Sequence, residues 1–202
     1  MSSNRHKMNA VVVWLGFVAY LWFPLPCVAQ TEQMPVPADS QVPLLLKVLT
    51  FDRNFSQKIT SALRIAIVYD PSNPESRRAQ RDIADILDRF STKTIKQLPI
   101  EYIPLQYRGE QTLDESAKAH NINVFYIAPG NARHLQALLR VSLEHQITTI
   151  TGVPDYVVQG VAVGIEVREN HKPGIFINLS ASKSHGCDFD AKLLQLARIV
   201  LN

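Results

Sequence analysis

Cysteine is nearly missing from this chain, and what little there is argues against disulfide chemistry. The 202 residues contain two cysteines, Cys27 and Cys187. Because Cys27 lies in an N-terminal segment that we expect to be removed, Cys187 would stand alone in the mature protein. A single cysteine forms no internal disulfide, so the fold is expected to depend on its apolar core, unless two chains pair through Cys187.

The common signatures of nucleotide, metal and redox sites are also absent. The sequence has no Gly-x-Gly-x-x-Gly, no Gly-x4-Gly-Lys-Ser/Thr, no His-Glu-x-x-His and no Cys-x-x-Cys. Beyond the N-terminal segment the histidines are scattered without the spacing of metal ligands: His120, His134, His145, His171 and His185. We therefore predict no metal and no cofactor.

Neither sign of charge is in excess. The formal net charge is +3, and loss of Arg5 and Lys7 with the N-terminal segment would reduce 21 basic residues to 19, against 18 acidic ones. The rest of the sequence contains no basic run interleaved with aromatic residues. A nearly neutral mature chain has no electrostatic basis for binding nucleic acid, which we exclude as a partner.

An export signal is predicted at residues 1–29. Its basic start is followed by an apolar run over residues 10–23, which two prolines break before Ala29. This order predicts cleavage between Ala29 and Gln30 and export of the mature chain. An uncleaved membrane anchor is the alternative, because the apolar stretch approaches spanning length. Lipidation of Cys27 is disfavoured, since no small residue directly precedes it.

One domain is expected after the signal. Residues 30–43 are polar and contain three prolines, so they are predicted to form a flexible linker to a domain over residues 44–202. Helical patterns alternate with apolar strand patterns there, at 63–69, 100–105, 124–128, 147–151, 161–167 and 175–179. This order predicts a three-layer α/β domain of Rossmann or flavodoxin type, mostly parallel, with a C-terminal β-hairpin and a closing helix.

Polar residues follow three of the predicted parallel strands. Ligands of open parallel sheets bind beyond the carboxyl ends of the strands, so these residues form a candidate ligand cleft. They are Asp70, Ser72, Asn73, Gly130, Asn131, Thr151 and Gly152. The alternative is that the two asparagines cap helices and the glycines only turn the chain.

A cluster of reactive side chains, His185-Gly186-Cys187-Asp188, has a structural interpretation. Gly186 is suited to end a short helical turn, and Asp188 to cap a closing helix that begins at Phe189. Nothing in the sequence places His185 as a base for Cys187, so we expect a buried thiol and no catalytic residue.

The C-terminal part of the chain resembles the YfiR-like periplasmic proteins. The resemblance lies in GVAVGIEVRENHKPGIFINLSASKSHGCDFDAKLLQLARIV and, more faintly, in NVFYIAPG and ITTITGVPDYVVQG upstream. The matching positions are Gly160, Asn178, Gly186, Leu194, Ala197 and Arg198, of which all but Arg198 are expected to be structural. Two features differ from the family pattern. TFDRNF replaces an aromatic-Trp-Pro feature, and disulfide-forming cysteine pairs are missing.

This resemblance implies a small exported α/β domain, often dimeric, that acts by binding a protein. The family's best known members look like repressors that engage the periplasmic domain of an inner-membrane diguanylate cyclase and lower cyclic-di-GMP signalling. The resemblance therefore implies a non-catalytic periplasmic regulator with a membrane protein as its partner, and a homodimer. The alternative function, motivated by the candidate cleft, is a small-ligand-binding half-domain of the periplasmic-binding-protein type, with an unknown ligand.

Overall fold

Parallel strands form the centre of an eight-stranded sheet in the computed structural model, which describes residues 32–201. Most of these parallel strands are short runs rich in β-branched and aromatic residues, as a strand covered on both faces requires. The central strands are β1 (Leu63–Tyr69), β3 (Leu98–Gln106), β4 (Val124–Ile127), β5 (Thr148–Thr151) and β6 (Val163–Val167). β1 lies between β3 and β4, and the sheet continues through β5 to β6.

The two margins of the sheet depart from the parallel pattern. β2 (Thr94–Ile95) pairs antiparallel with β3, and β7 (Pro173–Asn178) forms the predicted hairpin with β6. β8 (Arg198–Val200) then pairs parallel with β7. The full order is β2-β3-β1-β4-β5-β6-β7-β8. The predicted α/β fold class with a mostly parallel sheet is confirmed.

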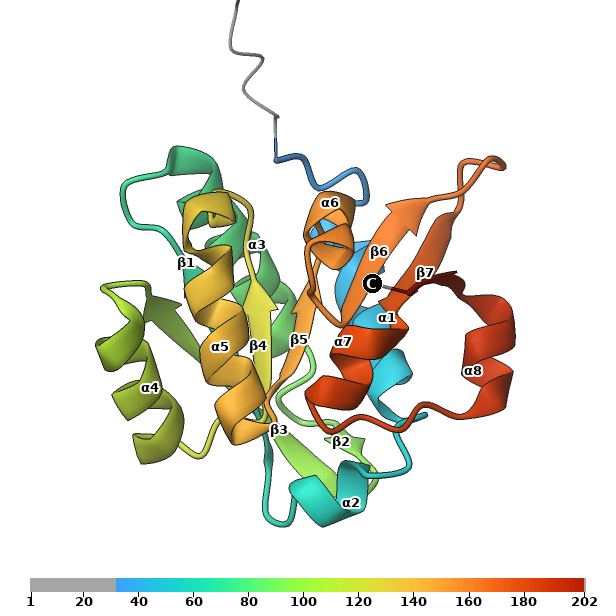
Figure 1. Cartoon of the computed structure of the whole chain (residues 1–202), viewed down its shortest axis with the longest axis horizontal. Coiled ribbons are helices and arrows are strands. Elements are labelled where there is room, and N and C mark those ends of the chain that lie inside the picture. The colour runs from blue at the N-terminus through green and yellow to red at the C-terminus, as the bar shows by residue number, and fades with distance from the viewer. Residues whose placement is uncertain (1–31, 202) are drawn as a thin grey trace, which may run out of the picture. The chain divides into compact units, whose positions relative to one another are not determined.

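Helices cover both faces of the sheet (Figure 1). On one face, α1 (Ala38–Leu49) and α3 (Pro74–Asp88) share a core with Ile65 and Ile67 of β1. On the other face, Ala66 and Val68 pack with α4 (Glu110–Ala119), α5 (Leu135–His145) and α6 (Pro154–Val158). Alternate residues of one strand thus enter two separate cores. The short helices are α2 (Phe55–Lys58), η1 (Ala132–His134), α7 (Leu179–Ser184) and α8 (Ala191–Leu196).

The linker prediction for residues 30–43 was wrong in its second half. Helix α1 begins at Ala38, and Val36 and Val42 are buried in the core. Gln41 is also buried, and its side-chain oxygen accepts a hydrogen bond from the hydroxyl of Tyr126. The polar, proline-rich composition concealed an apolar helix face that begins before Leu44, because Pro37 can precede a helix without disturbing it.

The closing helix is shorter than predicted. It spans Ala191–Leu196, and its N-cap is Asp190, whose side chain accepts from the backbone N–H of Lys192, where Asp188 was expected. Ala197 is extended, and the chain then forms β8. Isoleucine and valine at positions 199 and 200 favour a strand. The outer edge of β7 has backbone groups that need hydrogen-bond partners, and pairing with β8 supplies them.

The predicted signal segment and its cleavage site at Ala29 and Gln30 lie outside the described residues. Within residues 32–201, no helix is both long enough and apolar enough to cross a membrane.

Candidate functional site

The strongest candidate site lies where the topology of the sheet reverses. The chain leaves β1 for β3 on one side and later returns to β4 on the other, so the carboxyl ends of β1 and β4 are neighbours. Open α/β sheets bind ligands at such a switch point. The loops that follow these two strands line a pocket of about 440 Å³, which we call the strand-end pocket: Glu32, Asp70, Ser72, Asn73, Pro74, Gly130, Ala132 and Arg133.

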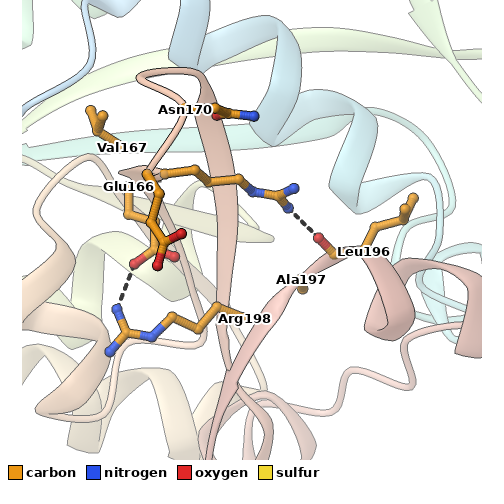
Figure 2. A pocket seen from close by; sticks show the side chains of 8 residues that line it. Glu166, Val167, Asn170, Leu196, Ala197 and Arg198 are labelled. Carbon is orange, nitrogen blue, oxygen red and sulfur yellow. Dashed lines mark hydrogen bonds and ion pairs between the residues drawn. The ribbon is translucent and has the colours of Figure 1, made fainter.

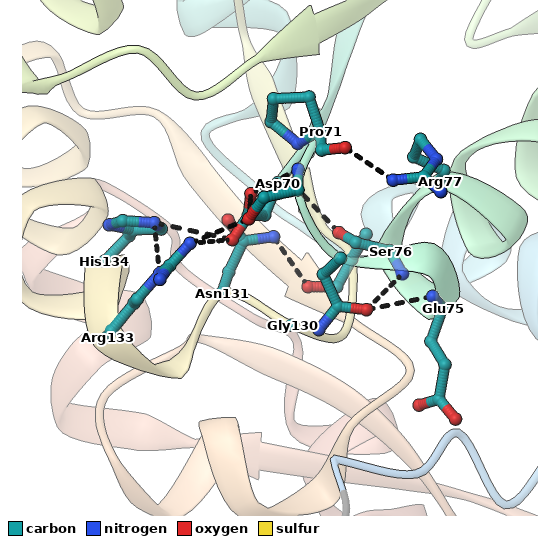
Figure 3. Close-up of polar contacts among 12 residues, drawn as sticks. Asp70, Pro71, Glu75, Ser76, Arg77, Gly130, Asn131, Arg133 and His134 are labelled. Carbon is teal, nitrogen blue, oxygen red and sulfur yellow. Dashed lines mark hydrogen bonds and ion pairs between the residues drawn. The ribbon is translucent and has the colours of Figure 1, made fainter.

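A buried carboxylate and an exposed guanidinium meet in the strand-end pocket (Figure 3). The side chain of Asp70 is 6% exposed, and its Oδ2 lies 2.5 Å from Nη2 of Arg133. Ser72 donates to the other oxygen, Oδ1, from its backbone N–H and its hydroxyl. Burial alone would raise the pKa of Asp70, but the bonds from Ser72 and Arg133 outweigh it and lower that pKa. Asp70 is therefore ionised at neutral pH.

A histidine lies beside Arg133 near the same carboxylate oxygen, and Nε of Arg133 donates to its Nε2 at 2.9 Å. Nε2 of His134 is 3.7 Å from Oδ2 of Asp70, and the imidazole stacks on Tyr107 with 4.1 Å between ring centroids. Burial and the neighbouring Arg133 lower the pKa of His134, against the opposing effect of Asp70. The imidazole is consequently neutral at neutral pH, so it contributes hydrogen-bonding capacity rather than charge.

Asn73 performs the capping role that the alternative interpretation assigned to it. Its side-chain oxygen accepts from the backbone N–H groups of Glu75 (2.9 Å) and Ser76 (3.2 Å), and Pro74 occupies the first turn of α3. The same side chain packs against Gly130, where an added Cβ would lie 2.5 Å from the Asn73 amide nitrogen. Gly130 has φ of +85°, so glycine suits both its conformation and its neighbour.

Asn131 does not cap the following helix with its side chain. It is fully buried, and its amide nitrogen donates to the backbone oxygens of Ala128 (2.9 Å) and Val68 (3.3 Å). Asn131 thereby ties the carboxyl ends of β1 and β4 together. Its side-chain oxygen has no hydrogen-bond partner. Among the described residues, every other buried side-chain nitrogen or oxygen has one.

The third predicted strand end does not reach the pocket. Thr151 is buried, and its hydroxyl donates to the backbone oxygen of Ile127 at 2.9 Å. Gly152 faces α1, because an added Cβ would lie 2.2 Å from the side-chain oxygen of Gln41. Two strand ends therefore converge, rather than the three that the sequence indicated, since α1 packs beside the end of β5.

Sequence reasoning missed Glu32 and Arg133, which line this pocket, and Tyr156, which binds Glu32 beside it. Arg133 comes two positions after Asn131 at the same strand end. The argument that strand ends line the cleft could therefore have included it. Glu32 lies in the predicted linker, and Tyr156 belongs to a short helix that the periodicity did not reveal. The carboxylate of Glu32 accepts hydrogen bonds from the backbone N–H of Gly130 and the hydroxyl of Tyr156.

The reactive cluster near the C-terminus is buried rather than assembled for catalysis. Cys187 is 4% exposed, and its Sγ lies 3.1 Å from Oγ1 of Thr148 and 3.6 Å from Nζ of Lys58. Burial raises the pKa of the Cys187 thiol. His185 is also buried, and its Nδ1 lies 3.2 Å from Oγ1 of Thr149. Cys187 and His185 each have a separate threonine partner. These contacts explain why the two polar side chains can be buried, and no catalytic role is needed.

A second surface lies at the C-terminal margin of the sheet (Figure 2). A pocket of about 670 Å³ is formed there by residues 166–170 and 196–198. Arg198 donates to Glu166 at 2.7 Å and lies over the ring of Phe176. Large apolar side chains are exposed on and beside this margin: Val167, Leu196, Ile199 and Leu201. We call these four residues the apolar margin.

A family model described as YfiR/HmsC-like matches residues 44–198, which include the strand-end pocket apart from Glu32, and most of the sheet margin. The chain belongs to the YfiR/HmsC-like family. The predicted resemblance is thus confirmed. No sequence among the curated proteins matches this YfiR/HmsC-like chain.

Solved structures similar to this YfiR/HmsC-like chain show its fold at low sequence identity. An ABC domain in complex with L-Trp from Streptococcus pneumonia has 10% identity and a TM-score of 0.56, over 81% of this chain and 62% of that one. A conserved domain protein from Vibrio cholerae O1 biovar eltor has 11% identity and a TM-score of 0.57, over 81% and 60%. A ligand-free, open substrate-binding protein with adhesive properties from Clostridium difficile has 14% identity and a TM-score of 0.50, over 74% of this chain and 58% of that one. This chain therefore spans about three fifths of their length, and the likeness concerns the fold alone.

The positions matched to the family pattern have mainly packing and backbone roles. Asn178 is buried, caps α7 by accepting from Ala181 N–H, and donates to the backbone oxygen of Val157. Gly160 and Gly186 have positive φ, at +115° and +74°. Leu194 and Ala197 pack against the core from α8 and its end. Arg198 is exposed at the sheet margin. It is the one position of the set that was not expected to be structural.

Proposed function

We propose that this YfiR/HmsC-like protein is an exported, non-catalytic regulator that binds the periplasmic domain of a membrane protein, such as a diguanylate cyclase. Family membership carries the proposal, since the family is regulatory. The apolar margin supports it. Leu196 is 61% exposed and Leu201 72% exposed, and large exposed apolar surfaces are typical of protein-binding sites.

A membrane pull-down tests this proposal. The protein is immobilised and incubated with solubilised membranes, and the captured proteins are identified by mass spectrometry. The wild type is expected to retain a membrane sensor or cyclase, and Leu196→Asp is expected to lose it at least about tenfold, because a charge replaces apolar contact area. Leu143→Asp is the matched control, since Leu143 is 54% exposed on α5 and away from this margin.

Cellular cyclic-di-GMP distinguishes regulation from simple binding. If the partner is a cyclase, deletion of this protein is expected to raise cyclic-di-GMP, and Leu196→Asp should reproduce the deletion while Leu143→Asp should not. Capture of no membrane protein by the wild type, together with unchanged cyclic-di-GMP on deletion, would contradict the proposal.

A second candidate function is the binding of a small ligand in the strand-end pocket. The buried Asp70 carboxylate, held by Arg133 at a topological switch point, favours it. A thermal-shift screen against amino acids, sugars and anions is the test, because a ligand that binds only the native state raises the melting temperature. Asp70→Ala should abolish the shift. If Asp70→Ala and Asn131→Ala lowered stability and left every ligand response unchanged, these residues would be structural only.

A further inference from the structure

Two hydrogen-bond donors, one from a loop and one from a helix, converge on one carboxylate oxygen beside the strand-end pocket. Oε2 of Glu32 accepts from the backbone N–H of Gly130, after β4, and from the hydroxyl of Tyr156, in α6. Glu32 comes from the segment before α1 and itself lines the pocket. The carboxylate is therefore bound there as a ligand would be, although it belongs to the same chain.

The hydroxyl of Tyr156 is arranged to donate at this point. Its side chain is 1% exposed, and its oxygen already accepts the backbone N–H of Asn131 at 2.8 Å. The phenol proton must therefore go to another acceptor, and among the described residues that acceptor is Glu32. Burial and the carboxylate raise the pKa of Tyr156, so the phenol keeps its proton.

Both donors belong to parts of the fold other than the segment that carries Glu32. Gly130 lies in the loop after β4, and Tyr156 lies in α6 and is buried in the core on that face of the sheet. If Glu32 moved away, two donors would lose their acceptor in a largely buried position, at a cost in free energy. A carboxylate from another molecule restores both bonds, and the adjacent pocket of about 440 Å³ has the size of a small-ligand site.

We propose that Gly130 and Tyr156 form a binding cradle for the carboxylate of a small ligand, and that Glu32 fills this cradle as an internal substitute when no ligand is bound. The inference rests on the second function above and specifies its ligand class. On binding, the ligand carboxylate takes over the two hydrogen bonds and releases residues 32–34 from the pocket, while Val36 stays buried in the core.

Propionate is the probe, since it reproduces the Glu32 side chain from Cβ outward, and propionamide is its uncharged control. The exported wild-type protein is compared with Glu32→Ala, and with Gln33→Ala as the matched control at the exposed neighbouring residue. Isothermal titration and thermal shift measure binding. Hydrogen exchange of the amides of residues 32–34 in the wild type measures release of the segment and needs no variant to fold.

Glu32→Ala is expected to bind propionate at least about tenfold more tightly than the wild type or Gln33→Ala, because the internal competitor is gone. Addition of Tyr156→Phe should remove that gain, and propionamide should not bind. In the wild type, saturating propionate should accelerate exchange at residues 32–34. Equal affinities of wild type and Glu32→Ala, or unchanged exchange, would overturn the inference.

The same titrations separate this inference from the pocket function on which it rests. A different ligand whose binding is lost in Asp70→Ala and retained in Tyr156→Phe would leave the small-ligand function standing and remove the carboxylate cradle. Absence of any ligand from the screen, together with no response to propionate, would remove both.

Discussion

Burial controls the protonation of single side chains near the C-terminus. His185 is 3% exposed, and burial with the nearby positive charge of Lys58 lowers its pKa to about 4. Its ordinary value is 6.5, so the neutral form is the one that the folded protein favours. Between pH 6.5 and pH 4 the unfolded chain therefore binds more protons than the folded chain at this residue, and stability falls as the pH falls.

Acidification should destabilise the protein through His185. We expect a loss of about 2 kcal/mol in the free energy of unfolding between pH 7 and pH 5 from this residue. Urea unfolding at both pH values measures it. In His185→Gln the loss should be smaller by about that amount, because glutamine does not titrate. An identical pH dependence in the two proteins would show that the imidazole is not buried in its neutral form.

The thiol of Cys187 should be protected in the folded protein. Its burial both restricts access and raises its pKa, and reaction requires the exposed thiolate. Labelling by a thiol reagent at pH 7.5 is expected to be at least about a hundredfold slower in native buffer than in denaturing urea. Labelling at similar rates in the two conditions would contradict this placement of the side chain.

At the scale of elements, helix ends account for three asparagine and aspartate side chains, one of which was predicted to line the ligand cleft. Asn73 caps α3, Asn178 caps α7 and Asp190 caps α8, each by accepting a backbone N–H. Gly186, with φ of +74°, follows the end of α7. Capping and pocket formation coincide at Asn73, so a loss of ligand binding in an Asn73 variant would be ambiguous unless stability is measured too.

The cap on α3 should contribute measurable stability. Asn73→Ala removes the acceptor for the N–H groups of Glu75 and Ser76, and is expected to lower the free energy of unfolding by about 1 kcal/mol. Asn73→Asp keeps an acceptor oxygen at the helix N-terminus and should retain most of the stability. Urea unfolding of both variants provides the comparison. Equal losses in the two would mean that packing against Gly130 matters and the cap does not.

At the scale of the whole molecule, the segment before Leu44 is part of the fold. Val36, Gln41 and Val42 are buried beneath or within α1, and Gln41 contacts the ends of both β4 and β5 through Tyr126 and Gly152. A tether would contribute no buried surface. The segment also brings Glu32 to the strand-end pocket, so residues that precede α1 take part in the candidate site.

Removal of this segment should therefore destabilise the domain. A chain that begins at Leu44 is expected to lose at least about 3 kcal/mol in the free energy of unfolding relative to one that begins at Thr31, from burial of Val36 and Val42 alone. Thermal and urea unfolding of the two chains measure the difference. If the shorter chain fails to fold, Val36→Ala with Val42→Ala provides a milder comparison. Equal stability would restore the linker interpretation.

The oligomeric state also belongs to this scale, and the dimer remains a prediction. Light scattering on the purified protein tests it, and a dimer that uses the apolar margin should become monomeric in Leu196→Asp.

The sequence by itself determined the local elements and their order. Strand β1 was predicted with its observed bounds, and the helix-capping role of Asn73 was one of the two interpretations, because a β-branched run and a helix cap depend on neighbours in the chain. The alternation of strands and helices then determined a parallel α/β sheet. It also placed Asp70 and Asn131 at adjacent strand ends, since connection rules limit the topologies available.

Only the tertiary structure decided which distant residues complete the site. Glu32 and Tyr156 are 124 residues apart in sequence, and they meet because α1 and α6 pack around the carboxyl ends of β4 and β5. The end of the chain became β8 instead of helix because β7 had a margin without a partner. These outcomes depend on contacts between elements, and no local pattern of residue types records such contacts.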